Sequence, residues 1–147
     1  MNCYAIPIKE KNLKKIGNKI IISLSKNGNI SKYRIIGNLI FLECTNQIDD
    51  GLIEGKEVFD SMISSSDEED IYNSIRKLVK NKKETNTFAV RVIRKGNHRY
   101  DSTSLARDVA GAAFEEWKKI SVNLGNPELE IFVQIINNIS IIYLKYS

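Results

Sequence analysis

The chain has 147 residues, 42% of them hydrophobic and 27% charged, and its formal net charge is +4. This length allows one ordinary domain or two very small ones, and the composition excludes a fibrous or disordered chain. The mildly basic balance is compatible with a nucleic-acid partner without requiring one.

The first 65 residues are expected to be rich in strands. The β-branched run at 19–25 predicts a strand that ends at the turn Asn27-Gly28-Asn29. Two further apolar runs, 33–36 and 39–44, flank Gly37-Asn38 and predict a hairpin.

The next stretch is polar and contains the clearest boundary in the chain. The sequence Asp49-Asp50-Gly51 predicts a turn, and residues 56–63 fit either a strand or a short helix. Ser64-Ser65-Ser66 predicts a loop and a helix cap, because the acidic residues 67–70 that follow suit the first turn of a helix. Apolar residues then recur at helical spacing up to the basic end 80–83.

A strand is predicted at 87–93. Its apolar residues fall on both faces, which favours a central strand covered at least partly on both sides. Arg91 is the exception and must reach solvent or a partner.

A basic loop, 95–99, leads into a helix predicted from Ser102, as its N-cap, to about Lys119. The small residues 110–113 would let this helix lie close against a sheet, and Trp117 would pack near its end. Isoleucine-rich strands are predicted near 129–135 and 139–146, after a connection through Asn126-Pro127. This order of elements predicts an α/β layer with helices on one or both faces of a sheet.

Positive charge is concentrated between residues 76 and 107. This span holds ten lysines and arginines but only two acids, Glu84 and Asp101, so the rest of the chain is net acidic. The cations fall on a helix end, a strand end with its loop, and the first turns of the next helix. We expect them to converge on phosphates around the helix start near Ser102; the alternative is an ordinary solvated basic face.

The predicted phosphate contacts come from this span, and His98 and Tyr100 are the candidates for contact with a ribose or base. Tyr100 is alternatively a half-buried residue at the end of a strand. The full set of candidate RNA-binding residues is Lys80, Lys82, Lys83, Arg91, Arg94, Lys95, His98, Arg99, Tyr100, Ser102 and Arg107.

No catalytic or cofactor motif is recognisable. The sequence has no glycine-rich phosphate loop, no nucleophile elbow and no metal-ligand spacing, so we expect no catalytic residue, cofactor or metal. The two cysteines, Cys3 and Cys44, are expected to be free thiols in a reducing compartment, with a single disulfide as the alternative.

The beginning of the chain has charge after a short apolar run, the reverse of an export signal. No apolar run approaches the ~18 residues of a membrane helix. We therefore expect a soluble, cytoplasmic protein without a membrane partner.

Four separated segments resemble the THUMP domain in order and spacing. They are Thr87-Phe-Ala-Val-Arg-Val-Ile-Arg-Lys95, Ser102-x-x-Leu-Ala-Arg-Asp-Val-Ala-Gly111, Val122-Asn-Leu-Gly-Asn-Pro127 and Ile131-Phe-Val-Gln-Ile135. The resemblance implies an α/β (α+β) fold, with a THUMP domain at 66–147 behind a small, degenerate ferredoxin-like domain at 1–65.

Within that family the chain looks most like the THUMP-only adaptor for tRNA cytidine N4-acetylation. Ala110, where many branches have glycine, fits that branch, whereas Gln134 stands where an acid is common. The resemblance implies a non-catalytic protein that holds the acceptor region and 3′ end of tRNA and presents it to a separate modifying enzyme, with the acetyltransferase favoured. No catalytic domain is expected in these 147 residues.

Three other functions remain open. The chain is alternatively the RNA-binding subunit of a tRNA methyltransferase or 4-thiouridine synthetase, which would leave the RNA contacts unchanged. It is otherwise a module whose basic face docks an acidic protein. An enzyme acting by itself is the least favoured reading.

Overall fold

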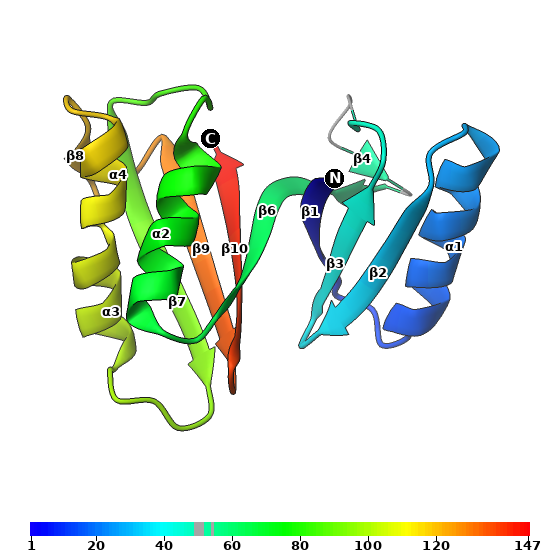
Figure 1. The fold of residues 1–147 in the computed structure, drawn as a ribbon, viewed down its shortest axis with the longest axis horizontal. Coiled ribbons are helices and arrows are strands. Elements are labelled where there is room, and N and C mark those ends of the chain that lie inside the picture. Colours follow the sequence, from blue (N-terminus) through cyan, green and yellow to red (C-terminus); the bar gives the residue numbers. More distant parts are fainter. Residues whose placement is uncertain (49–51, 54) are drawn as a thin grey trace. The chain divides into compact units, whose positions relative to one another are not determined.

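A computed structural model describes residues 1–48, 52, 53 and 55–147 (Figure 1). The described chain forms two compact units, Met1–Ser61 and Met62–Ser147. The boundary predicted from the sequence, between residues 65 and 66, lies slightly later. The fold is mixed α/β, as predicted.

The first unit is a small antiparallel sheet with one helix. Its strand order is β2-β3-β1, and the first residues of β6 pair with the other side of β1. The predicted hairpin is confirmed as β2 and β3, and the ambiguous segment 56–63 is strand except at residue 58. The elements are β1 (Asn2–Pro7), α1 (Leu13–Lys26), β2 (Ser31–Ile36), β3 (Leu39–Cys44), β4 (Leu52–Ile53), β5 (Lys56–Glu57) and β6 (Phe59–Ser65). The turn predicted at 49–51 lies outside the described residues.

The strand predicted at 19–25 is wrong, because these residues belong to helix α1. Asn12 caps the helix, its side chain accepting a hydrogen bond from the Lys15 backbone N–H at 3.2 Å. Leu13, Ile16 and Ile20 recur at helical spacing and pack against the buried face of the sheet. The β-branched run favours a strand locally, but burial of this stripe outweighs a preference of a few tenths of a kcal/mol per residue.

The second unit is a sheet covered on one face by helices (Figure 1). Strand β7 pairs in parallel with both β9 and β8, while β9 and β10 form an antiparallel hairpin. The elements are α2 (Glu68–Val79), β7 (Thr87–Lys95), α3 (Ser102–Val109), α4 (Gly111–Glu116), β8 (Ser121–Val122), β9 (Leu129–Ile136) and β10 (Ile139–Tyr146). The predicted order of helices and long strands is confirmed.

The core of this unit lies between the sheet and all three helices. Alternate residues of the strands, such as Phe88 and Ile131, point towards buried helix residues such as Ile75 and Leu105. Trp117 is buried at the end of α4, as predicted. Each fully buried large apolar side chain contributes about 1.5–3 kcal/mol relative to an exposed one.

The long helix predicted from Ser102 to Lys119 is shorter and divided. Helix α3 ends at Val109, Ala110 joins it to α4, and α4 ends at Glu116. The small residues do permit close packing, but part of it is against a helix: a side chain added at Gly111 would lie 3.3 Å from the Tyr72 hydroxyl of α2.

Strand β7 lies between β9 and β8, as its two apolar faces predicted, but only its first residues have a neighbour on both sides. It pairs with β9 from Phe88 to Lys95, but with β8 only through Thr87 and Phe88. Beyond Phe88, the other edge of β7 has no neighbouring strand in the described part of the chain. Ile93, on the face of the sheet opposite the helices, is 53% exposed.

Both cysteines are free thiols, as predicted. They lie on neighbouring strands, but Cys3 is paired with Glu43 and Cys44 with Asn2. Because side chains alternate along a strand, the two thiols point to opposite faces of the sheet. Burial, followed by the nearby Cys3 thiol, raises the pKa of Cys44 from 9.0 to about 11.

We expect Cys44 to react slowly with thiol reagents in the folded protein. A pKa two units above normal lowers the thiolate fraction near pH 8 by about a hundredfold, and the thiolate is the reactive form. Labelling of Cys3→Ser by iodoacetamide, with and without denaturant, measures this directly. Similar labelling rates with and without denaturant would contradict the burial of Cys44. The variant Cys44→Ser is the control, because it reports the labelling rate of Cys3 alone.

Candidate nucleic-acid interface

The basic loop after β7 is held by its own hydrogen bonds. Arg94 Nη1 donates to the Gly96 carbonyl at 3.1 Å and contacts His98 Nδ1 at 3.2 Å. His98 Nε2 lies 2.7 Å from the Asn137 carbonyl. Because a carbonyl only accepts, this geometry places the ring proton on Nε2 and leaves Nδ1 to accept from Arg94.

Tyr100 completes this loop. Its ring stacks on His98 with centroids 5.3 Å apart and planes 6° from parallel. Its hydroxyl donates to the Ser66 carbonyl at 2.5 Å, tying the loop to the start of α2. The two residues predicted to contact a ribose or base therefore stack on each other, and one ring face of each is already occupied.

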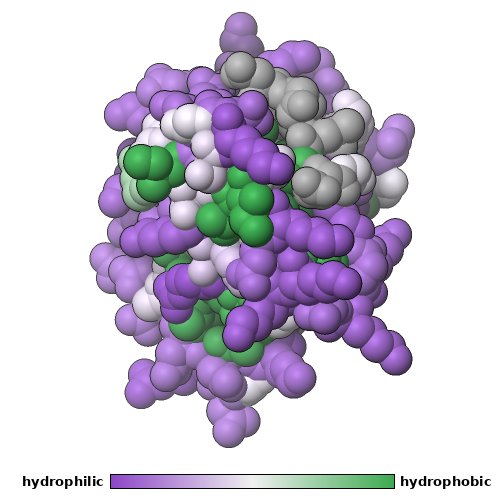
Figure 2. Space-filling view, turned by 90° about the vertical axis from the view of Figure 1, so that its right-hand side faces the viewer, coloured by the Kyte–Doolittle hydropathy of each residue, from purple (hydrophilic) through white to green (hydrophobic). Residues whose placement is uncertain are grey.

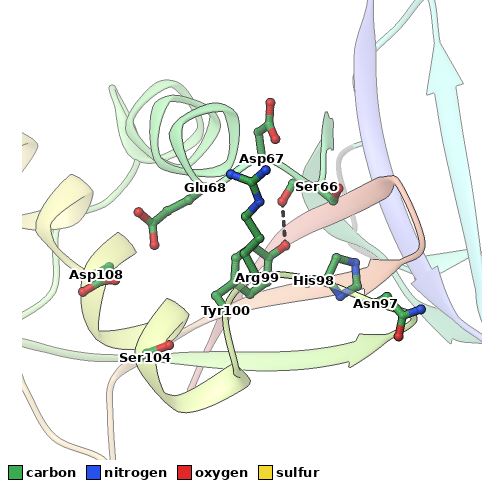
Figure 3. A pocket seen from close by; sticks show the side chains of 9 residues that line it. All are labelled: Ser66, Asp67, Glu68, Asn97, His98, Arg99, Tyr100, Ser104 and Asp108. Atoms are coloured by element: carbon green, nitrogen blue, oxygen red, sulfur yellow. Dashed lines mark hydrogen bonds between the residues drawn. The ribbon is translucent and has the colours of Figure 1, made fainter.

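A shallow hollow of about 910 Å³ opens beside this loop (Figure 3). Figure 3 shows the Arg99 side chain extending towards Asp67, and Glu68 directed towards Asp108 of α3. Burial, then a hydrogen bond and charge repulsion from Asp108, raise the pKa of Glu68. The residues around the hollow are Ser66, Asp67, Glu68, Asn97, His98, Arg99, Tyr100, Ser104 and Asp108. Three carboxylates accompany its one arginine, so this hollow is a poor phosphate site.

The start of α3 is also less available to an anion than predicted. The N-cap is Asp101, not Ser102, and its carboxylate accepts the Ser104 backbone N–H at 2.8 Å. Hydrogen bonds from Ser104, the backbone one above all, lower the pKa of Asp101. An external phosphate would have to approach a helix end that already carries this negative charge.

The three basic segments do not converge. Lys83 lies at the end of the sheet where β7 begins, since its carbonyl accepts the Tyr146 hydroxyl at 2.7 Å. The loop with Lys95 lies at the opposite end, where the Asn137 N–H donates to the Lys95 carbonyl at 2.8 Å. A nine-residue strand rising about 3.3 Å per residue separates these groups by roughly 25–30 Å.

More lysines gather where β7 begins. The segment after α4 reaches the same end of the sheet, because Ser121 donates to the Asn86 carbonyl at 3.0 Å. We call this group the lysine end: Lys80, Lys82, Lys83, Lys118 and Lys119. All are exposed except the half-buried Lys82. Sequence reasoning missed Lys118 and Lys119 because they lie outside the basic span.

Arg91 and Arg107 line a different, largely apolar groove of about 590 Å³ between β7 and α3–α4, which Ser102 also lines. Arg91 Nε forms an ion pair with Glu130 at 3.0 Å, and a second guanidinium nitrogen donates to the Leu124 carbonyl at 2.8 Å. The prediction that Arg91 must reach solvent or a partner is thus confirmed, and the partner is intramolecular.

Helix α1 carries a second row of cations that sequence reasoning missed. Lys15, Lys19 and Lys26 are exposed and lie on one side of the helix, where successive turns place residues three and four apart next to each other. Figure 2 shows that the side of the molecule on which α1 lies is mostly hydrophilic, with small separate hydrophobic areas. The spacing of these lysines was informative only once the segment was known to be helical.

The described residues contain no group of three or more His, Cys, Asp or Glu side chains placed to hold a metal ion. Within the same ranges, no helix is both long and apolar enough to cross a membrane.

The second unit is a helix-covered sheet with the lysine end at one end and the acid-lined hollow at the other, and this arrangement makes it a small α/β module. Residues 65–145 match the family model of the THUMP domain, which covers more than half of the chain. The chain belongs to the THUMP domain family.

The probable tRNA sulfurtransferase of Methanosarcina mazei is 38% identical over 66 residues, which are 42% of this chain and 16% of that protein. The chain therefore spans about a sixth of the length of this curated relative. Two solved structures share the fold over 99% of the chain. PH1313 from Pyrococcus horikoshii has a TM-score of 0.71 at 18% identity, with 54% of that chain covered. A 4-thiouridine synthetase–RNA complex with bound ATP has a TM-score of 0.70 at 13% identity, with 41% covered.

We expect the loop after β7 to depend on Gly96. Its φ is +112°, and a Cβ there would lie 2.6 Å from the Asn137 side-chain oxygen and 3.2 Å from its Cα. Gly96→Ala should lower the free energy of unfolding by about 2–3 kcal/mol, through backbone strain and this clash. Gly28→Ala is the control, since φ is also positive but nothing lies within 4 Å; about 1 kcal/mol is expected. Urea titrations would measure both, and equal losses would contradict the close packing of Gly96 on Asn137.

We expect Asp101→Ala to lower the thermal midpoint more than Ser102→Ala does, because Asp101 is the residue that caps α3. The lowered pKa of Asp101 means that its stabilisation is present above its unfolded pKa of 3.8 and disappears as pH falls through the folded value. The difference between wild type and Asp101→Ala should therefore vanish in acid. Thermal scans of wild type and both variants from pH 7 to pH 2 would measure this difference. A larger decrease of the thermal midpoint in Ser102→Ala than in Asp101→Ala would show that Ser102 caps the helix.

Proposed function

We propose that this protein binds tRNA through its cationic surfaces and acts in tRNA modification without being the catalyst itself. Membership of the THUMP family supports this proposal, as do relatives whose names are tRNA sulfurtransferase and a fold shared with a 4-thiouridine synthetase solved with RNA. The observation that carries it is the lysine end, where exposed cations from two separate connections gather at one end of the sheet.

Phosphate contact is the physical basis of this binding. Lys80, Lys83, Lys118 and Lys119 form no ion pair within the described ranges, so they can release counterions from RNA without first losing a protein carboxylate. The neighbouring Arg76 is different, since it lies 3.6 Å from both Glu115 and Glu116. The row on α1 provides a second set of cations in the other unit. The loop cations contribute less, because Arg99 faces the acidic hollow and Arg94 is held by Gly96 and His98.

The non-catalytic role is supported by the sequence, which contains no recognisable catalytic motif. In this proposal the protein presents the acceptor region of tRNA to a separate enzyme in the cytoplasm, with a cytidine N4-acetyltransferase as the first candidate from the sequence resemblance. A second candidate is the RNA-binding subunit of a thiolation enzyme, and the names of the curated relatives favour it. Copurification with an acetyltransferase, or with a sulfurtransferase, would separate the two.

We expect tRNA binding to depend on the lysine end more than on the loop after β7. Lys83→Gln with Lys119→Gln removes two phosphate contacts and should reduce the slope of log K against log salt by roughly 2 units, at about 0.9 per contact. Lys15→Gln with Lys19→Gln should act similarly through α1. Gel shifts with unmodified tRNA across a salt series would measure the slopes.

Lys95→Gln with Arg99→Gln is the matched control, because it removes the same charge from the acid-lined end. Its slope should stay close to that of the wild type. A larger loss from this pair than from Lys83→Gln with Lys119→Gln would move the RNA interface to the loop. Absence of tRNA binding by the wild type at low salt would overturn the proposed function.

A further inference from the structure

The edge of β7 beyond Phe88 presents unpaired backbone groups. Three hydrogen bonds establish which residues face this edge. Asn123 donates to Phe88 O and Ser121 to Asn86 O, each at 3.0 Å and on the β8 side, whereas Asn137 donates to Lys95 O from the opposite side. Because N–H and C=O groups alternate sides along a strand, the even-numbered residues of β7 face the β8 side.

Val90, Val92 and Arg94 therefore direct their backbone N–H and C=O groups to a side where β8 has already ended. Folded proteins usually cover or blunt such an edge, because it is a template for another strand. Here, in the part of the chain that the structure describes, β8 covers only the first two residues of β7.

The missing strand position is next to an apolar groove. Val90 and Val92 border the groove from the sheet, and Ala106, Ala110 and Phe114 border it from α3 and α4. The residues at its β8 end are unusually exposed for apolar side chains: Phe114 is 40%, Val122 49% and Leu124 66% exposed. An added strand would cover these side chains and also pair the edge of β7.

Three cations and the carboxylate of Glu130 lie around this edge. Arg91 and Lys95 project from the face of the sheet opposite the helices, and Arg107 lines the groove from α3. Arg91 has one carboxylate partner, Glu130, while Arg107 is exposed and has no ion pair among the described residues. A strand that carries carboxylates on alternate residues would complement these cations.

We propose that the edge of β7 from Val90 to Arg94 receives an extended segment of a partner protein as an added strand. The segment alternates apolar residues, which face the groove, with acidic residues, which face Arg91 and Lys95. The β8 end of the groove adjoins the segment that carries Lys118 and Lys119. The proposal goes beyond the RNA-binding function and does not depend on it, because it concerns a protein strand on the edge of β7.

Other occupants fit the edge less well. A ladder of alternating N–H and C=O groups matches a peptide backbone, whereas the RNA backbone offers phosphate oxygens, which only accept. A second copy of this chain is disfavoured by charge, because its exposed edge strand β2 carries Lys32 and Arg34. Pairing β7 with β2, or with another β7, would place like charges opposite each other.

A blocked peptide of about seven residues that alternates valine and glutamate would test the proposal on the full chain, since this is the length of a typical strand. In NMR experiments the peptide should bind saturably and slow amide exchange at Val90, Val92 and Arg94. The same peptide with lysine in place of glutamate should not bind, and the glutamate peptide N-methylated on alternate amides should not bind either. Binding without protection of these three amides, or equal binding of the lysine peptide, would overturn the proposal.

Two variants locate the site. Val92→Pro removes an N–H that faces the open edge, so the chain should fold and bind tRNA as before but lose the peptide. Ile93→Pro is its matched control, because it removes an N–H bonded to β9 and should lower the thermal midpoint markedly. Leu124→Asp places a carboxylate at the exposed groove end and should weaken the glutamate peptide at least tenfold without a loss of fold.

Peptide binding that is unchanged in both Val92→Pro and Leu124→Asp would overturn the added strand. Displacement of the peptide by single-stranded RNA would assign the groove to nucleic acid, and dimerisation of the wild type that Val92→Pro abolishes would assign the edge to a second copy. If the wild type does not bind tRNA, only the proposed function is contradicted, because the peptide measurements do not involve RNA.

Discussion

The parallel pairing of β7 with β9 is the constraint on which the second unit depends. Two parallel neighbours cannot be joined by a tight turn, so the chain must cross back over the sheet before β9 begins. Helices α3 and α4 make this return, and with α2 they bury one face of the sheet around Phe88, Leu105 and Ile131. Because of this return, the connection before β7 and the connection after α4 lie at the same end of the sheet. The loop after β7 lies at the opposite end.

This topology gives the two ends of the sheet different charge environments. The connections at the start of β7 carry the lysine end, while the loop at its finish meets the acidic first turn of α2 and the carboxylates of Asp101 and Asp108. A phosphate backbone gains from the first environment and is repelled by part of the second. The arginines and lysines of one basic span therefore have different roles, although they are neighbours in sequence.

The two sides of strand β7 also differ in how far they are paired. On one side β7 is paired along its length with β9, and on the other it is paired for only two residues. The cations around the open edge discourage pairing between copies of this chain, whose own edge strand β2 is basic. In the proposed complex the same cations would favour a partner strand that carries carboxylates.

The sequence by itself determined the local elements of the second unit, because apolar periodicity, acidic helix starts and isoleucine-rich strands all act over a few residues. It also determined the family, through four segments whose order and spacing agree. It did not identify α1, since a β-branched run favours a strand until the burial of Leu13, Ile16 and Ile20 on the sheet is included. Nor did it distinguish Asp101 from Ser102 as the cap, because both residue types suit that position.

Only the tertiary structure decided which cations share a surface and which strand edge stays open. Charge density along the chain cannot report either property, because a nine-residue strand moves its two ends roughly 25–30 Å apart while they remain close in sequence. Strand pairing likewise depends on partners distant in the chain. The apolar residues of β7 indicated a strand with neighbours on both sides, but they could not show that β8 pairs with only two of its residues.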